Sequence, residues 1–368
     1  MKTIGRILML GVGFFASAAC SLFPARKPAL PRGFPLPLQV EIRLEIDGEL
    51  TGSLQAWAGK IYFSTRKGIL YAVDAGSKKI LWKTETNLPL VSPPSVGFDR
   101  IVFSDQNNGI HCLNLDGKEL WAMTALAKLS ADIILDSGRI YAVVDGTDIL
   151  ALNAVDGAEA WRFKAGSAIR TPPMIWNLQV VFAASDGKIH VLDPQGRLRT
   201  SLETGSAAEG PLFVEKNRLY FGQAEGVYRC LDLASHKTLW TVKTGGLPTS
   251  RPAVDGRRIY VVTSNDVLFC FDKMNGNLEW WRILSARSPF SPAVGDDQVF
   301  AASSSSVLTI LKKTTGVQAG IFNAGEQLRA SPLLIGGNLV VPASAPDAVL
   351  GGLLFLKGTP PPEPAKKK

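Results

Sequence analysis

The sequence predicts an all-β fold: an eight-bladed β-propeller with four antiparallel strands per blade, closed into a ring by an N-terminal strand in the last blade. A motif that ends in Trp in five of its seven copies recurs at intervals of 39 or 40 residues. Each copy holds four short segments rich in Val, Ile, Tyr and Phe. Such a period with four short strands per unit is typical of propellers. The body from 38 to 358 is then close to eight units.

The Trp position is the most regular feature of the repeat. It falls at Trp82, Trp121, Trp161, Thr200, Trp240, Trp280 and Gly320. Alternating apolar residues predict strands before it, as in 259–262 and 267–271. Glycines such as Gly276 suit the positive φ of a tight turn between the third and fourth strands. The Trp then offers an apolar face to the adjoining blade and an indole N–H for one hydrogen bond. Trp57 and Trp176, in or beside first strands, are expected in the core.

The two ends of the chain complete the count of blades. The eighth unit begins at 331–334 and reaches 353–356, but its fourth strand would fall on the Pro-rich segment 359–364, which cannot form a strand. The segment 38–46 alternates cleanly and has no other place in the count. We therefore predict that it supplies the missing strand, which removes an exposed sheet edge. Seven blades with a stray first strand are the alternative.

Residues 1–19 have the features of an export signal: a basic start, a short apolar run and small residues before Cys20. The Cys makes the segment resemble a bacterial lipoprotein signal, which implies that Cys20 carries acyl chains such as palmitate and attaches the protein stably. That family has Leu, Val or Ile where this chain has Ser17, so an ordinary secretory signal is the alternative. Ser21 resembles the residue that directs such lipoproteins to the outer membrane.

Two Pro-rich segments flank the predicted propeller. Residues 20–37 are expected to form an extended tether, and 359–368, which end in three Lys, a disordered tail. The net charge of +8 over 368 residues is too dilute for a nucleic-acid surface. With 4 Cys a disulfide scaffold is excluded. The sequence has no stretch of 18 apolar residues, so it predicts no membrane-spanning helix.

The unit, with Asp, then Gly, then Trp, resembles the pyrroloquinoline-quinone propeller repeat. Quinone-dependent dehydrogenases of that family have a pair of adjacent Cys, which this chain lacks, and are much longer, so a quinone enzyme is a less favoured alternative. The chain resembles more closely the BamB-type lipoproteins of the outer-membrane β-barrel assembly machinery, also in the segment 20–23. This resemblance implies a non-catalytic scaffold without a cofactor, lipid-anchored in the outer membrane and facing the periplasm.

The same resemblance implies two partners: the barrel-assembly subunit and unfolded outer-membrane proteins. The family contacts that subunit through loops between blades. One such loop has an apolar residue and Arg ahead of the fourth blade, where this chain has Ile169 and Arg170. The next loop is acidic in the family, and here only Glu209 is present. Arginines, which are enriched at binding hot spots, precede first strands at four places: Arg170, Arg251, Arg287 and Arg329.

No constellation of catalytic or metal-binding residues is found. The cysteines of the body occupy a strand position that elsewhere holds small apolar residues, so structural thiols are expected: Cys112, Cys230 and Cys270. The three His lie in different units and match no local metal spacing. Nucleophile elbows and phosphate loops do not occur. A lipoprotein that binds or senses a small ligand or glycan in the central funnel is the alternative function from another class.

Overall fold

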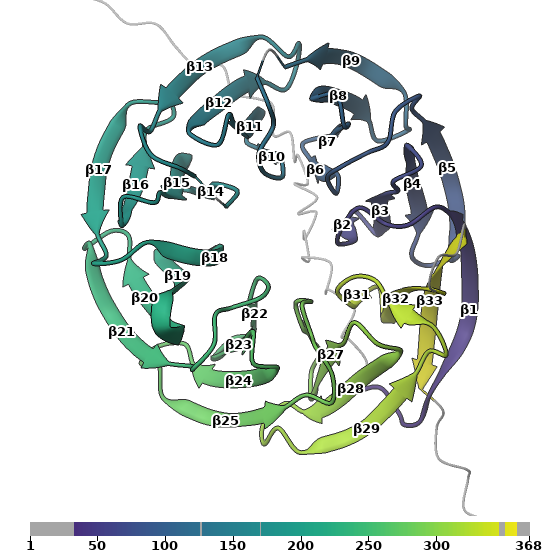
Figure 1. Ribbon diagram of the computed structural model, residues 1–368. Coiled ribbons are helices and arrows are strands. Elements are labelled where there is room, and N and C mark those ends of the chain that lie inside the picture. Colours follow the sequence, from purple (N-terminus) through teal and green to yellow (C-terminus); the bar gives the residue numbers. More distant parts are fainter. Residues whose placement is uncertain (1–32, 126, 170, 346–349, 359–368) are drawn as a thin grey trace, which may run out of the picture.

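A computed structural model describes residues 33–125, 127–169, 171–345 and 350–358. They form a ring of eight antiparallel sheets arranged around a central opening, and each sheet is one blade (Figure 1). The only helical element among these residues is a single 3₁₀ turn, η1 (Ala224–Gly226). The described part of the chain has no helix that is both long and apolar enough to span a membrane.

Four strands follow one another from the centre of each blade to its rim, and a short extra strand, β30 (Gln327–Leu328), joins the last blade. The innermost strands are β2 (Gln55–Trp57), β6 (Ser95–Gly97), β10 (Ile134–Asp136), β14 (Met174–Trp176), β18 (Ala208–Glu215), β22 (Ala253–Val254), β26 (Ala293–Val294) and β31 (Leu333–Ile335). The second strands are β3 (Lys60–Ser64), β7 (Arg100–Ser104), β11 (Arg139–Val144), β15 (Gln179–Ala183), β19 (Arg218–Gln223), β23 (Arg258–Val262), β27 (Gln298–Ala302) and β32 (Asn338–Ser344). The third strands are β4 (Ile69–Asp74), β8 (Gly109–Asn114), β12 (Asp148–Asn153), β16 (Lys188–Leu192), β20 (Val227–Asp232), β24 (Val267–Asp272), β28 (Val307–Lys312) and β33 (Leu350–Gly358). The outermost strands are β5 (Lys79–Glu85), β9 (Glu119–Thr124), β13 (Glu159–Lys164), β17 (Leu198–Glu203), β21 (Lys237–Lys243), β25 (Leu278–Ile283), β29 (Gln318–Asn323) and β1 (Leu38–Asp47).

The N-terminal strand closes the ring, as predicted. β1 pairs antiparallel with β33, from Leu38 opposite Gly358 to Asp47 opposite Leu350. Figure 1 shows β1 and β33 side by side in this blade. The eight-blade prediction is therefore confirmed, and the alternative of seven blades with a stray strand is wrong.

The hydrophobic core lies between neighbouring blades. Second and third strands are buried along almost their whole length, because a blade covers each of their faces; β23 is an example. Outer strands such as β13 alternate between half-buried and exposed residues, since their edge meets solvent. This accounts for continuous apolar runs in the middle of each repeat and clean alternation at its end.

Neighbouring blades are joined by a Trp that packs on a glycine. The indole nitrogen of Trp82 donates a hydrogen bond to the carbonyl of Leu115 at 3.0 Å, as the sequence predicted. Its ring lies against Gly117, where an added Cβ would come within 2.7 Å of the ring. The same hydrogen bond, always 33 residues ahead, comes from four further Trp, at 2.9–3.2 Å: Trp121, Trp161, Trp240 and Trp280.

Where the Trp is missing, the glycine of the next blade is missing too. Thr200 stands at the Trp position of one blade, and the turn of the next blade holds His236 at φ 60° instead of Gly. β1 has no Trp either, and the following turn carries Lys78 at φ 58°, paired with Glu41. The close approach of a Trp ring is thus what restricts this turn to glycine.

The chain ahead of β1 is held against one face of the ring. The backbone N–H of Phe34 donates to Gln298 Oε1 at 2.8 Å, and Gln298 Nε2 donates to the Phe34 carbonyl at 3.0 Å. The Phe34 ring meets Phe300 edge to face. Leu36 lies over Gly320, the residue at the Trp position of that blade. The first described residues therefore join the body at the turns between inner and second strands.

Of the two tryptophans expected in the core, Trp57 is exposed and Trp176 is only partly buried. Trp57 is 39 % exposed at the end of β2, where the inner strand turns toward β3. Trp176 is half-buried, and its indole nitrogen donates to Asn217 Oδ1 at 3.1 Å. Inner strands end at a face of the ring, so large residues there remain in contact with solvent.

We expect Gly117→Ala to destabilise the protein more than Gly166→Ala. Both glycines have positive φ, +80° and +73°, so both substitutions carry the same backbone strain of about 1–2 kcal/mol. Only the methyl at 117 meets Trp82, whereas nothing lies within 4 Å of position 166. Overpacking should add about 1–3 kcal/mol at Gly117. Chemical denaturation of both variants measures the difference, and equal losses would contradict the role of the Trp–Gly contact.

Candidate functional site

The ring has two faces, which differ in the loops and turns that form them. Loops that run from an outer strand to the next inner strand form bridges with the ends of second strands, such as Ile169 with Ala184 and Pro248 with Thr263. These loops lie beside the turns between second and third strands. We call this side the loop face, and the opposite side, with the other turns of each blade, the turn face.

Ile169 is placed in the core. Its side chain is 2 % exposed and packs in a cluster with Val143 and Phe182. The same repeat position holds Leu50, Leu90 and Leu328, which are also buried. The period of the sequence therefore contained a sign that this position is structural.

The other predicted site residues are distributed as follows. Glu209 is half-buried in β18, opposite Gly222, and lines the central cavity. Arg170 and Cys20 lie outside the described residues. The predicted partner contacts at Ile169, Arg170 and Glu209 and the predicted lipidation at Cys20 remain predictions.

A cavity of about 1120 Å³ occupies the centre of the ring. All eight blades contribute to its wall through the residues that precede their inner strands. Two positions ahead of the inner-strand residue that pairs with the third residue of the second strand, the repeat places one residue of each blade on this wall: Ser53, Pro93, Asp132, Pro172, Pro211, Arg251, Ser291 and Ser331. Six of these are Ser or Pro. Asp132 and Arg251 are the two charged exceptions.

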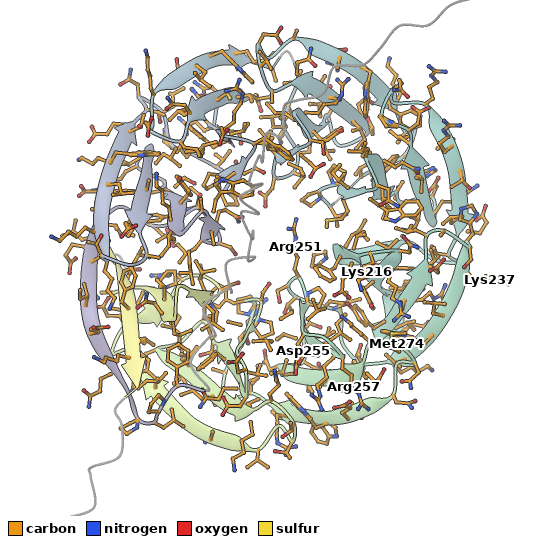
Figure 2. All side chains as sticks on the ribbon, turned by 180° about the vertical axis from the view of Figure 1, so that it is seen from behind. Lys216, Lys237, Arg251, Asp255, Arg257 and Met274 are labelled. Carbon is orange, nitrogen blue, oxygen red and sulfur yellow. The ribbon has the colours of Figure 1, made fainter. Side chains whose placement is uncertain are left out.

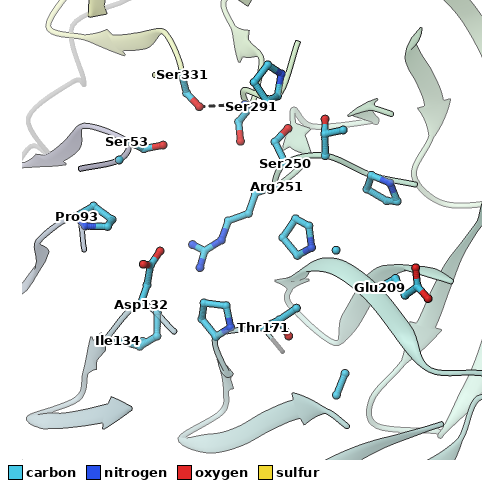
Figure 3. Close-up of a pocket in the computed structure, with 18 of the residues that line it drawn as sticks. Ser53, Pro93, Asp132, Ile134, Thr171, Glu209, Ser250, Arg251, Ser291 and Ser331 are labelled. Carbon is cyan, nitrogen blue, oxygen red and sulfur yellow. Dashed lines mark hydrogen bonds between the residues drawn. The ribbon is translucent and has the colours of Figure 1, made fainter. Parts of the chain in front are cut away.

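Asp132 and Arg251 project into the cavity from different walls. In Figure 2 the Arg251 side chain points into the central opening, while Lys237 lies on the outer rim. In the close-up of Figure 3 the guanidinium group extends toward the Asp132 carboxylate. Burial raises the pKa of Asp132, and the positive charge of Arg251 partly opposes this rise. Burial lowers the pKa of Arg251, which Asp132 partly offsets. Arg251 is one of the four arginines that the sequence places ahead of first strands, whereas no pattern in the sequence pointed to Asp132.

The three described cysteines are free and buried. Each lies opposite the Trp of the neighbouring outer strand, where a small side chain fits: Cys112 with Trp121, Cys230 with Trp240 and Cys270 with Trp280. Burial raises the pKa of Cys112 to about 11 and those of Cys230 and Cys270 to about 12. All three are therefore protonated thiols at neutral pH.

The strand histidines are stacked and hydrogen-bonded. The His111 ring stacks on Phe103 with centroids 5.1 Å apart, and its Nε2 lies 2.9 Å from Asp105 Oδ2. His190 stacks on Phe182 and lies 3.0 Å from Asp186 Oδ2. These rings take the place of aromatic side chains in other blades. Within the described ranges no three His, Cys, Asp or Glu side chains are grouped as a metal site would require.

The family model for outer membrane protein assembly factor BamB matches residues 39–122, 66–280 and 199–341 of the chain. These matches run through nearly the whole ring. The chain belongs to the BamB family.

Individual BamB proteins are distant in sequence and close in fold. BamB of Nitrosomonas eutropha is 25% identical over 125 residues, which is 32% of this chain and 30% of that protein. The aligned part thus spans about a third of that curated relative. The crystal structure of BamB from Moraxella catarrhalis covers 88% of this chain and 98% of its own, with a TM-score of 0.73 and 15% identity.

The same ring also occurs in an enzyme. The quinohemoprotein alcohol dehydrogenase from Comamonas testosteroni covers 89% of this chain and 78% of its own, with a TM-score of 0.66 and 11% identity. At such identity the likeness concerns the fold alone.

We expect Cys112, Cys230 and Cys270 to resist alkylation in the native protein. Iodoacetamide reacts with the thiolate, and burial keeps all three groups protonated at pH 8. Peptide mapping should find them unmodified after native treatment and fully modified after treatment in denaturant. Rapid labelling of any one of them in the folded protein would contradict its placement in the core.

Proposed function

We propose that this protein is a non-catalytic lipoprotein of the outer membrane that serves as a scaffold for β-barrel protein assembly. It binds the barrel-assembly subunit through loops between blades and helps to deliver unfolded outer-membrane proteins to it. The observation that carries this proposal is the match of the BamB family model along the ring. A rigid ring with exposed loops suits a docking role.

The place where the N-terminal segment joins the ring supports a defined orientation of the scaffold. Phe34 and Leu36 hold the N-terminal segment at the turn face, beside Gln298 and Gly320. With lipid on Cys20, the tether would span 20–32, at most about 3.5 Å per residue, or roughly 45 Å. The turn face would then lie nearest the membrane, and the loop face with Glu209 would remain open to a partner.

The partner contact is proposed at Arg170, ahead of the fourth blade, and at Glu209, near the start of β18 in the fifth blade. Ile169 is buried, and it would act by fixing the chain next to Arg170 through its bridge to Ala184. Arg is enriched at binding hot spots.

Co-purification from native membranes tests the scaffold, its anchor and its site together. We expect tagged protein extracted in mild detergent to retain an outer-membrane barrel-assembly protein, identified by mass spectrometry. The intact mass should correspond to loss of 1–19 and gain of acyl chains at Cys20. Arg170→Glu should abolish recovery of the partner, because charge reversal at a hot spot commonly costs several kcal/mol.

Arg287→Glu is the matched control, because Arg287 is an exposed Arg of the loop ahead of another blade. Recovery should be unchanged in this variant. Retention of the partner by Arg170→Glu would refute the site while leaving the scaffold. Absence of any assembly protein from the wild-type sample would refute the scaffold itself.

The apolar outer edge of the sixth blade supports the proposal that the protein binds extended polypeptide during delivery. β25 is the outermost strand of its sheet, so one of its edges has no partner in that sheet. Trp281 and Ile283 on this strand are 48 % and 69 % exposed. The position of Ile283 is polar in the other outer strands of the repeat, with Glu85, Thr124, Lys164, Glu203, Lys243 and Asn323. Charged or polar edges discourage strand addition, and an apolar edge permits it.

We expect Ile283→Lys to weaken binding of an unfolded outer-membrane strand peptide by roughly tenfold. The substitution removes part of an apolar contact worth about 1.5–3 kcal/mol when fully buried and gives β25 the charge that Lys243 gives β21. Fluorescence anisotropy of a labelled peptide with alternating apolar residues measures the affinity. Thr124→Lys, at the same position of β9, should leave it unchanged. Equal affinities for wild type and Ile283→Lys would exclude this edge.

A further inference from the structure

The central cavity holds two opposite charges that the ring does not neutralise. Asp132 and Arg251 replace Ser or Pro at two of the eight equivalent wall positions. They influence one another through space, yet neither accepts or donates a hydrogen bond to another described side chain, and no ion pair joins them. Folding has therefore placed both charges inside the ring without pairing them.

Two hydroxyl groups on the same wall also lack partners. Thr171 Oγ1 and Ser250 Oγ are buried and make no hydrogen bond to a described residue. Both side chains line the cavity, on the arc that leads from Asp132 to Arg251 through the fourth and fifth blades. Thr171 is only 8 % exposed. Buried polar groups are usually satisfied, so a rotation of these side chains toward the cavity would give each hydroxyl a partner there.

We propose that the cavity binds a short zwitterionic peptide, with its carboxylate at Arg251 and its ammonium group at Asp132. A guanidinium group donates two parallel hydrogen bonds to a carboxylate, and a carboxylate accepts from an ammonium group. Thr171 and Ser250 would meet the peptide's amide groups between the two ends.

The size and charge of the cavity favour this ligand class. At about 1120 Å³ the cavity slightly exceeds the usual range for small-molecule sites, which leaves room for several residues. A single anion would satisfy Arg251 and be repelled by Asp132. A single cation would be repelled by Arg251. A ligand that carries both charges can pair with both Asp132 and Arg251, whose side chains are exposed in the cavity.

Isothermal titration calorimetry with four forms of tetraalanine tests the proposal on the mature, full-length protein. The peptide with two free ends should bind. Acetylation of its amino end, or amidation of its carboxyl end, should each weaken binding about tenfold or more, since each removes a charge-assisted hydrogen bond. The peptide capped at both ends should bind weakest. Equal binding of all four forms, or absence of binding by the free peptide, would overturn the proposal.

Two wall variants assign the ends. Arg251→Gln should make the affinity insensitive to amidation while acetylation still weakens it, and Asp132→Asn should show the reverse. Arg287→Gln, an exposed arginine outside the cavity wall, should behave as wild type. Loss of both sensitivities in one variant, or of neither, would refute the assigned orientation. If a variant fails to fold, as its melting curve would show, the affinities of the four peptides for the wild-type protein still test the proposal. The scaffold proposal does not depend on any of these outcomes.

Discussion

The contact between a Trp ring and the glycine of the next blade is the constraint on which the ring depends. It joins an outer strand to a turn 33 residues ahead by one hydrogen bond and one close packing contact, as between Trp82 and Gly117. The third-strand residue opposite each Trp must then be small, which explains Ala72, Cys112 and Ala151 in that place. Where this contact is absent, other pairs replace it: Lys78 with Glu41, and Leu36 over Gly320. Stability is thus distributed over many equivalent junctions at the rim.

Rigidity at the rim leaves the centre of the ring free to vary. The wall position ahead of the inner strands is Ser or Pro in six blades, and Ser291 and Ser331 join two neighbouring blades there, yet two blades hold Asp132 and Arg251 instead. The outer edges are similarly free, and there Ile283 replaces the polar residues of other blades. In a repeat protein, departures from the repeat at solvent-facing positions are where specific interactions can evolve without loss of the fold.

Most of the fold could be predicted from the sequence, because a period of 40 with Trp, Gly and alternating strands leaves few other architectures. Closure by 38–46 follows from the proline-rich end of the chain and from clean alternation near the start. The candidate site is harder to predict. The sequence predicts a partner contact at Ile169, yet its repeat position holds Leu in other blades and its bridge with Ala184 lies in the core. Asp132 was missed because it meets Arg251 only when eight separate segments converge around one axis.

Closure by β1 makes the first strand to be synthesised the last to find its place. Leu38 pairs with Gly358, 320 positions later in the chain. The entropy of closing so large a loop is modest: three doublings from one blade to eight add only about 2 kcal/mol. The effect on the folding rate is larger, since contacts between residues distant in sequence form slowly. Until then β33, with its buried run from Leu353 to Leu356, presents a bare apolar edge. A ring in which β1 has not yet paired with β33 would itself be a substrate for the chaperones of its compartment.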